Sequence, residues 1–146
     1  MGDLLRSKGG EFGTTTGRPR RCGWIDIPQL RYAAKINGFD DINLTKLDVL
    51  TGFPELKIGV EYVHNNECLP DMPASLRTYS EVQIMYASMP GWEEDLSKCR
   101  SFESLPKNAQ NYVLRIEELT GVHIRWIGVG AGREDIIDRG PAPVMA

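Results

Sequence analysis

A short segment near the start of the chain combines hydroxyl donors with fixed positive charge. Three threonines stand between two glycines and run into three arginines, at Gly13–Gly17, Arg18, Arg20 and Arg21. Glycines let backbone N–H groups come close to a ligand, and an arginine fork can grip a phosphate or a carboxylate through paired hydrogen bonds. A solvated basic surface turn would have the same composition. The segment therefore predicts either an anion-binding loop or an exposed basic turn.

A second polar segment, Thr45-Lys46-Leu47-Asp48, follows a short apolar run. A carboxylate just beyond a strand can accept hydrogen bonds from both N1–H and the exocyclic amine of guanine, a donor pair that adenine does not offer. The lysine stem can lie along the flat face of the base. Four such residues are also common in ordinary turns, so a base-reading site and a structural turn both remain open from the residues alone.

Gly128-Val129-Gly130 follows another apolar run. Glycines after a strand often mark only a tight turn, and a lone G-x-G is a weak nucleotide signal. The histidines and cysteines of the chain are widely separated, at His64, His123, Cys22, Cys68 and Cys99. Because no metal-ligand spacing or C-x-x-C pair joins them, we expect structural or solvated histidines and reduced thiols.

Composition places the chain among ordinary globular proteins. Its 146 residues are 41% hydrophobic and 25% charged, with a net charge of −3. That length allows one domain with a moderate core, and the acidic balance argues against a general nucleic-acid surface. No apolar stretch approaches the roughly 18 residues of a membrane span, and the N-terminus shows no secretion signal. We therefore expect a cytoplasmic protein with no membrane or nucleic-acid partner.

Hydrophobic spacing and turn residues predict alternating helices and strands. Helices are predicted over roughly 27–37, capped by Asp26 and followed by Gly38, and over 106–120, followed by Gly121. Strands are predicted over 42–45, 56–63, 81–86 and 122–127, and an irregular loop over 67–78. This alternation is typical of an α/β protein whose ligand-binding loops lie at strand ends.

Taken together, these segments resemble adenylosuccinate synthetase. The run G-T-T-T-G-R-P-R-R-C-G-W at 13–24 resembles a signature of that family, and further similar segments follow in the family's order, at Leu44–Leu50, Met89–Trp92, Leu105–Gly121 and Trp126–Gly130. The resemblance covers about residues 3–137. It implies an α/β fold that is the C-terminal part of a large mixed-sheet, P-loop-NTPase-like enzyme fold. Residues 1–139 would form that portion, and 140–146 a frayed tail.

The resemblance also assigns residues to ligands. A loop closing over L-aspartate would consist of Thr14, Thr15, Thr16, Gly17, Arg18, Pro19 and Arg20. Within it, Arg18 matches an arginine on the IMP side and Arg20 one on the GTP side, while Pro19 stiffens the turn and is typical of eukaryote-like members. The guanine base of GTP would be contacted by Lys46, Leu47, Asp48, Gly128, Val129 and Gly130.

The reaction implied by the resemblance is the GTP-dependent ligation of IMP and L-aspartate to adenylosuccinate, in AMP biosynthesis. The γ-phosphoryl group first goes to the purine 6-oxygen, and the aspartate amine then displaces that phosphate; such transfers depend on positioning and on stabilising developing charge. Magnesium is implied as the cofactor, GTP as a co-substrate and a homodimer as the assembly.

One family feature is absent from the 146 residues: the glycine-rich G-D-E-G-K-G loop, which supplies the catalytic aspartate, a magnesium ligand and phosphate contacts. We therefore expect no catalytic residue and no metal ligand in this fragment, and no turnover by the chain alone. One alternative is a non-catalytic truncated paralogue or pseudogene product with partial guanine-nucleotide binding. Another, a stand-alone GTP-binding module, would need a phosphate loop that this sequence does not contain.

Overall fold

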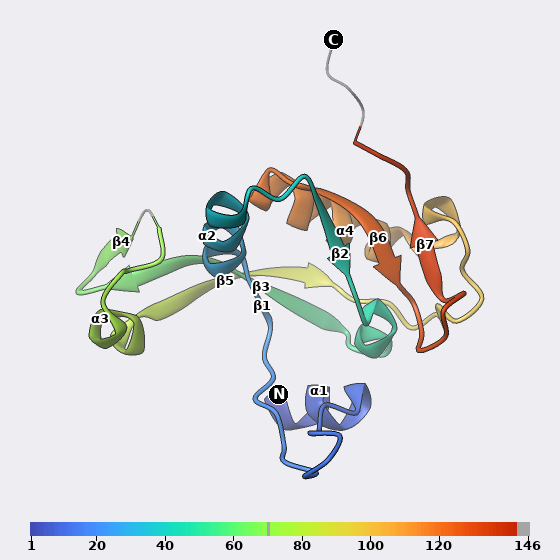
Figure 1. Ribbon diagram of the computed structural model, residues 1–146, viewed down its shortest axis with the longest axis horizontal. Coiled ribbons are helices and arrows are strands. Elements are labelled where there is room, and N and C mark those ends of the chain that lie inside the picture. Colours follow the sequence, from blue (N-terminus) through green and yellow to red (C-terminus); the bar gives the residue numbers. More distant parts are fainter. Residues whose placement is uncertain (70, 143–146) are drawn as a thin grey trace.

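The computed structural model describes residues 1–69 and 71–142 and contains two small sheets with helices beside them (Figure 1). The helices are α1 (Gly2–Gly9), α2 (Ile27–Asn37), α3 (Leu76–Glu81) and α4 (Lys107–Thr120), with 3₁₀ turns η1 (Leu47–Leu50) and η2 (Phe102–Ser104). The strands are β1 (Ile25–Asp26), β2 (Asp41–Leu44), β3 (Glu55–His64), β4 (Glu67–Leu69), β5 (Gln83–Pro90), β6 (His123–Gly128) and β7 (Ile136–Asp138).

Two mixed sheets divide the strands between them. In the first, the long strand β3 pairs with β1 in parallel and with β4 and β5 in antiparallel fashion. In the second, β6 pairs with β2 in parallel and with β7 in antiparallel fashion. Because β2 and β6 run the same way, the chain leaves both strands at the same edge of the sheet, which is where α/β proteins place ligand-binding loops.

The core forms where the two longest helices meet the sheets. The apolar stripe of α4 is buried at Ala109, Tyr112, Val113 and Ile116. Helix α2 contacts both α4 and β3, and in the view of Figure 1 both helices lie above β3 and β5. Asp26 fixes the start of α2, since Gln29 N donates to its Oδ1 at 3.0 Å and Tyr62 of β3 donates to its Oδ2 at 2.6 Å.

The predicted helices and strands are confirmed, with shifts of a few residues at their ends. The loop predicted over 67–78 is confirmed only at 71–75; at its two ends it is wrong, because β4 occupies 67–69 and α3 begins at Leu76. Helix α3 has only six residues and buries none of them, so its sequence carries no apolar stripe that would predict a helix. Its start is fixed by the N-cap Ser75, whose side chain accepts from Thr78 N at 3.3 Å. Helix α1 and the short strands β1 and β7 were not predicted.

The frayed tail predicted for 140–146 falls mostly outside the described residues, which end at 142. Gly140 itself is bonded: its N–H donates to Asp138 Oδ1 at 2.8 Å, and its carbonyl oxygen lies 3.2 Å from His123 Nε2. The first residue of the predicted tail is thus attached to the second sheet.

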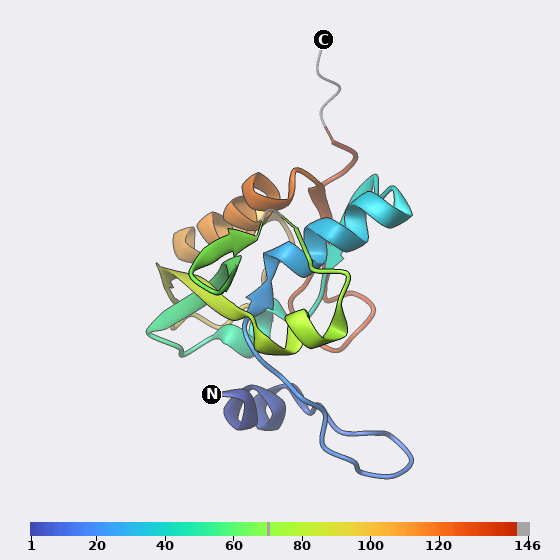
Figure 2. The ribbon, with the colours of Figure 1, turned by 90° about the vertical axis from the view of Figure 1, so that its left-hand side faces the viewer.

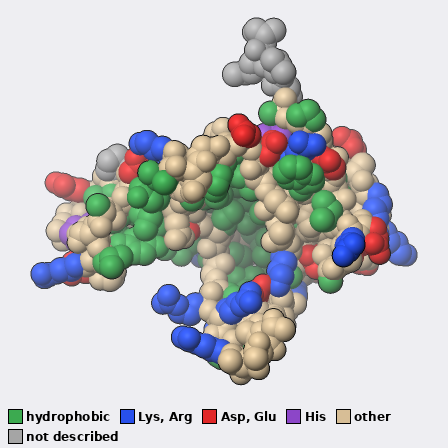
Figure 3. Space-filling model, viewed as in Figure 1, with side chains coloured by type: hydrophobic (Ala, Val, Ile, Leu, Met, Phe, Trp, Pro, Cys, Tyr) green, Lys and Arg blue, Asp and Glu red, His purple; other side chains and the backbone are tan. Residues whose placement is uncertain are grey.

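The N-terminal segment docks against η1. Helix α1 buries Leu5 and contacts η1, while Lys8 Nζ donates to the carbonyl oxygen of Thr51 just beyond that turn. In Figure 1 this segment lies below the sheets, and in Figure 3 Lys and Arg side chains gather over it. Helix α1 therefore gives the glycine- and arginine-rich segment a fixed attachment close to the end of β2.

Candidate functional site

The two segments predicted to hold guanine meet at the ends of β2 and β6. Leu44 of β2 lies opposite Ile127 of β6, so Thr45 and Gly128 follow at the same edge. The approach is close: a Cβ added to Gly128 would lie 3.3 Å from Thr45 Cα and 3.4 Å from Lys46 N. The backbone then turns into η1 at Lys46, whose φ is 62°. Strand pairing therefore brings together segments about 80 positions apart in the sequence.

Asp48 lies in the first turn of η1, next to the buried Leu47. Its Oδ1 atom is buried, and no group in the described part of the chain donates a hydrogen bond to it. Asp41 Oδ1 is also buried without a donor among the described residues, but the other oxygen of Asp41 lies 3.9 Å from Arg125 Nη1. A buried polar atom without a partner costs about 1–3 kcal/mol. The fold therefore leaves one oxygen of the Asp48 carboxylate without a donor among the described residues.

Asp135 organises the loop that follows β6. Its backbone oxygen accepts from Val129 N at 2.8 Å, and its Oδ2 accepts from Gly132 N at 2.8 Å. Arg100 Nη2 donates to its Oδ1 at 3.1 Å. A Cβ added to Gly130 would lie only 2.5 Å from Asp135 Oδ2, so the Asp135 carboxylate occupies the space that a side chain at position 130 would need. The Gly128–Gly130 segment is thereby held in one conformation.

The arginine segment forms a hairpin. Phe12 and Pro19 pair across it, Gly13 N donates to Arg18 O at 2.8 Å, and Gly17 N donates to Gly13 O at 2.8 Å. The three threonines at its tip are exposed, and Figure 2 shows this loop, in blue, projecting away from the body of the chain. The hairpin is ordered by its own backbone bonds, while the threonine side chains at its tip are exposed to solvent.

Glu11 links the hairpin to the guanine segments. Arg20 Nη1 lies 2.9 Å from its Oε2, and Lys46 Nζ donates to its Oε1 and, at 2.6 Å, to Gly9 O. The two cations, Lys46 foremost, hold the pKa of the Glu11 carboxyl below its usual range. One carboxylate therefore joins Lys46, predicted to contact the base, to Arg20, predicted to contact GTP.

The structure brings together some predicted site residues and leaves others apart. Arg20 meets Lys46 through Glu11, and the Thr45–Asp48 segment meets Gly128. By contrast, Thr16 and Arg18 form hydrogen bonds within the projecting hairpin: Arg18 N donates to Thr16 Oγ1, and Arg18 O accepts from Gly13 N. The hairpin thus meets the Thr45–Asp48 segment at its base, through Glu11 and Lys46, and not at its tip.

Sequence reasoning missed two organising carboxylates, Glu11 and Asp135. Glu11 lies three positions before the predicted loop, and a carboxylate close to a run of arginines was the available signal. Asp135 lies a few residues beyond a glycine-rich turn and carries no motif of its own. Their roles depend on side-chain contacts across long sequence separations, 35 positions for the Glu11–Lys46 pair and 35 for the Arg100–Asp135 pair.

Two hollows flank the junction. One of about 200 Å³ lies among Gly23–Ile25, Leu44–Leu47, Leu50 and Tyr112. The other, of about 460 Å³, is lined by the hairpin itself, at Gly13, Thr16 and Arg18–Arg21. Ligand pockets commonly occupy about 300–1,000 Å³, so the first hollow is smaller than a typical ligand pocket, and the second is within the range but is lined by hairpin residues alone. The candidate site is an open surface built around the junction of hairpin, η1 and β6.

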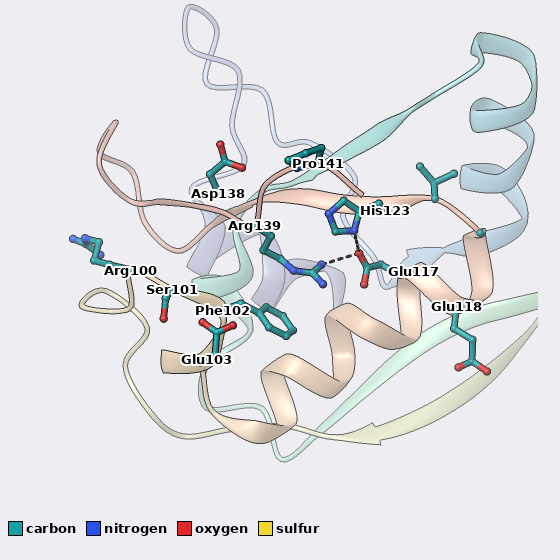
Figure 4. Close-up of a pocket in the computed structure, with 12 residues that line it drawn as sticks. Arg100, Ser101, Phe102, Glu103, Glu117, Glu118, His123, Asp138, Arg139 and Pro141 are labelled. Carbon is teal, nitrogen blue, oxygen red and sulfur yellow. Dashed lines mark hydrogen bonds and ion pairs between the residues drawn. The ribbon is translucent and has the colours of Figure 1, made fainter. Parts of the chain in front are cut away.

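A larger cavity, of about 780 Å³, lies between the start of η2, the end of α4 and the segment after β7 (Figure 4). Three of its polar side chains form one cluster: Glu117 Oε1 lies 2.7 Å from both Arg139 Nη1 and His123 Nδ1. Arg139 also stacks over the Phe102 ring, 4.3 Å from its centroid. These contacts fasten the segment after β7 to α4 and β6, and no predicted site residue lines the cavity.

The described residues contain no group of three or more His, Cys, Asp or Glu side chains that could hold a metal ion. The described side chains therefore form no magnesium site of their own. Within residues 1–69 and 71–142, no helix is both long enough and apolar enough to cross a membrane.

Comparison with known proteins gives one family. The family model described as adenylosuccinate synthetase matches residues 1–137. An adenylosuccinate synthetase of Phaeodactylum tricornutum is 60% identical over 139 residues, which are 95% of this chain and 26% of that protein. Adenylosuccinate synthetase 1, chloroplastic, of Oryza sativa subsp. japonica is 56% identical over 137 residues, which are 93% of this chain and 28% of that protein.

A solved structure agrees. The chain is similar to fully ligated adenylosuccinate synthetase from Plasmodium falciparum, with a TM-score of 0.91, 45% identity, and coverage of 95% of this chain and 34% of that one. The predicted α/β fold, part of a larger mixed-sheet, P-loop-like enzyme, is thereby confirmed. The chain spans about a quarter to a third of the length of the curated relatives it matches, between 25% and 33%.

Proposed function

The chain belongs to the adenylosuccinate synthetase family, and on that premise we propose that it supplies the guanine-binding surface and the L-aspartate loop of a GTP-dependent ligase. That ligase joins IMP and L-aspartate to form adenylosuccinate in AMP biosynthesis. Because residues 1–146 contain no G-D-E-G-K-G loop, we assign binding and orientation to them, and no bond-making step.

One observation carries the proposal: the buried, unpartnered Oδ1 of Asp48 at the junction of η1 and β6. Guanine offers adjacent N1–H and amine donors, which a carboxylate can accept together. Adenine presents no donor at N1, so the same carboxylate would stay unpaired beside it, and the base would be rejected. Lys46, whose Nζ is fixed by Gly9 O and Glu11, would lay its stem along the base, and the Gly128–Gly130 backbone would face the opposite side.

The hairpin would serve the anionic reactants. Thr14–Thr16 are exposed at its tip, where their hydroxyls would meet the carboxylates of L-aspartate. Arg18, next along, would contact IMP, and Arg20, at the base of the hairpin, would contact GTP. Fixed cations at these places hold the reactants in line and stabilise the charge that develops during phosphoryl transfer.

Further family properties belong to the same proposal. The complete ligase would use magnesium through residues other than those described here, and would assemble as a homodimer. We also propose a cytoplasmic location. Four of the compared relatives, from rice, wheat and sorghum, are named chloroplastic, so imaging the tagged native protein would decide between these compartments.

The proposal is tested by base selectivity. Isothermal titration of the 146-residue chain with GDP and with ADP should give binding of GDP at least about tenfold tighter, the factor that one satisfied charged hydrogen bond supplies. The Asp48→Asn variant should lose most of that preference, whereas Asp95→Asn, at an exposed carboxylate on the loop after β5, should keep it. Equal affinity for the two nucleotides in the unsubstituted chain would refute the assignment.

A further inference from the structure

We propose that Glu11 is a positioning residue that couples the guanine surface at Lys46 to the arginine loop at Arg20. The inference rests on the proposed function, since it takes these two cations as ligand-binding groups. No motif marks Glu11, and its role follows from its place between two segments that approach one another only in the folded chain.

The first argument is geometric. Glu11 uses its two carboxylate oxygens separately: Oε2 lies 2.9 Å from Arg20 Nη1, and Oε1 accepts from Lys46 Nζ. A side chain divided in this way cannot rotate without weakening both pairs. Movement of Lys46 when a base packs along its stem is therefore transmitted to the Arg20 guanidinium through one rigid carboxylate.

The second argument is exposure. The Glu11 side chain is only 21% exposed, whereas the side chains of Arg20 and Lys46 are 60% and 49% exposed. The carboxylate is thus the inner partner, and each cation keeps an outer face for a ligand. Glu11 holds the cations in place without covering them, as expected of a positioning group.

The third argument is anchoring. Glu11 follows the C-cap Gly10 of α1, a helix that contacts η1 and bonds through Lys8 to Thr51 just beyond it. Its carbonyl oxygen accepts from Arg20 N at 3.0 Å, closing the base of the hairpin. These backbone contacts persist when the carboxylate is replaced by an amide, so the Glu11→Gln substitution isolates the side-chain coupling from the fold.

The test follows the Arg20 guanidinium by nitrogen-15 NMR in the 146-residue chain without ligand. Rotation about its Nε–Cζ bond is slowed by pairing at Nη1, and a purely structural role for Glu11 would not alter this signature. Lys46→Met should speed the rotation about two- to fivefold, because the free energy of an ion pair of this exposure corresponds to a rate factor of about that size. In the Glu11→Gln background, Lys46→Met should have no further effect.

The matched control is Glu118→Gln, which removes a glutamate paired with Arg115 at 2.6 Å on the outer face of α4 and should leave Arg20 unchanged. The coupling is overturned if Lys46→Met leaves the rotation unchanged, or changes it equally with and without the Glu11 carboxylate. Guanosine, which lacks phosphates, provides a second arm: it should alter the Arg20 signal in the unsubstituted chain and not in Glu11→Gln. If guanosine shifts no signal at Asp48 or Gly130, the proposed function fails, while the ligand-free cycle still decides the coupling.

Discussion

Replacing Asp48 by Asn should make the ligand-free chain more stable, because the native carboxylate is arranged for a ligand and not for the fold. Its Oδ1 is buried without a donor among the described residues, a situation worth about 1–3 kcal/mol of destabilisation. An amide has nearly the same shape and removes the charge, while its own oxygen still lacks a donor. We therefore expect the free energy of unfolding to rise by about 1 kcal/mol, and the melting temperature by about 2–4 °C.

Urea unfolding at pH 7, followed by tryptophan fluorescence, measures this change, with an unchanged dependence on urea as the sign that only stability has moved. Asp95→Asn is the matched control. Asp95 accepts from Ser97 N at 2.9 Å and Ser97 Oγ at 2.7 Å, bonds that hold the pKa of its carboxyl below the usual range. Its substitution should not stabilise the chain. A loss of stability in Asp48→Asn would show that the carboxylate has a partner in the free protein, and the reasoning would be refuted.

Three further outcomes test the account. Ile116→Ala, in the fully buried stripe of α4, should cost about 2–5 kcal/mol of unfolding free energy in urea titrations. Gly130→Ala should lower the free energy of unfolding by about 1–3 kcal/mol and expose the Gly132 amide to hydrogen exchange, because the new methyl would collide with Asp135 Oδ2. The control Gly23→Ala should do neither, because no atom lies within 4 Å of its added Cβ. The pKa of Glu11 is lowered from 4.5, so its ion pairs are fully formed above that pH and break as the pH falls through the lowered pKa. NMR should therefore show the hairpin loosening only below about pH 4.5. Loosening nearer neutrality would contradict this.

The elements with strong periodicity could be predicted from the sequence. Helix α4 carries a regular apolar stripe ending at Gly121, and α2 carries an N-cap and a glycine stop; both were located within a residue or so of their observed ends. Helix α3 was missed because it buries none of its side chains, and Leu76 at its start is 82% exposed. Local patterning identifies elements that pack against a core, and α3 does not.

The candidate site divides in the same way. The segments around Asp48 and Gly130 could be found from their residue types and order, because the end of a strand is visible in sequence. Their junction depends on the parallel pairing of β2 with β6, and Glu11 and Asp135 act through contacts that only the folded chain creates. Ligand roles for the hairpin residues remain predictions that binding experiments must decide.

Exchange of base specificity tests most directly whether Asp48 reads the nucleotide. Xanthine carries a carbonyl oxygen where guanine carries its exocyclic amine, so it pairs with an amide donor and not with a carboxylate. We predict that the unsubstituted chain prefers GDP to xanthosine diphosphate, and that Asp48→Asn reverses the order, each by about tenfold or more. If both proteins keep the same order of affinities, Asp48 does not contact the base, and the account of this surface as the guanine site of the family is contradicted.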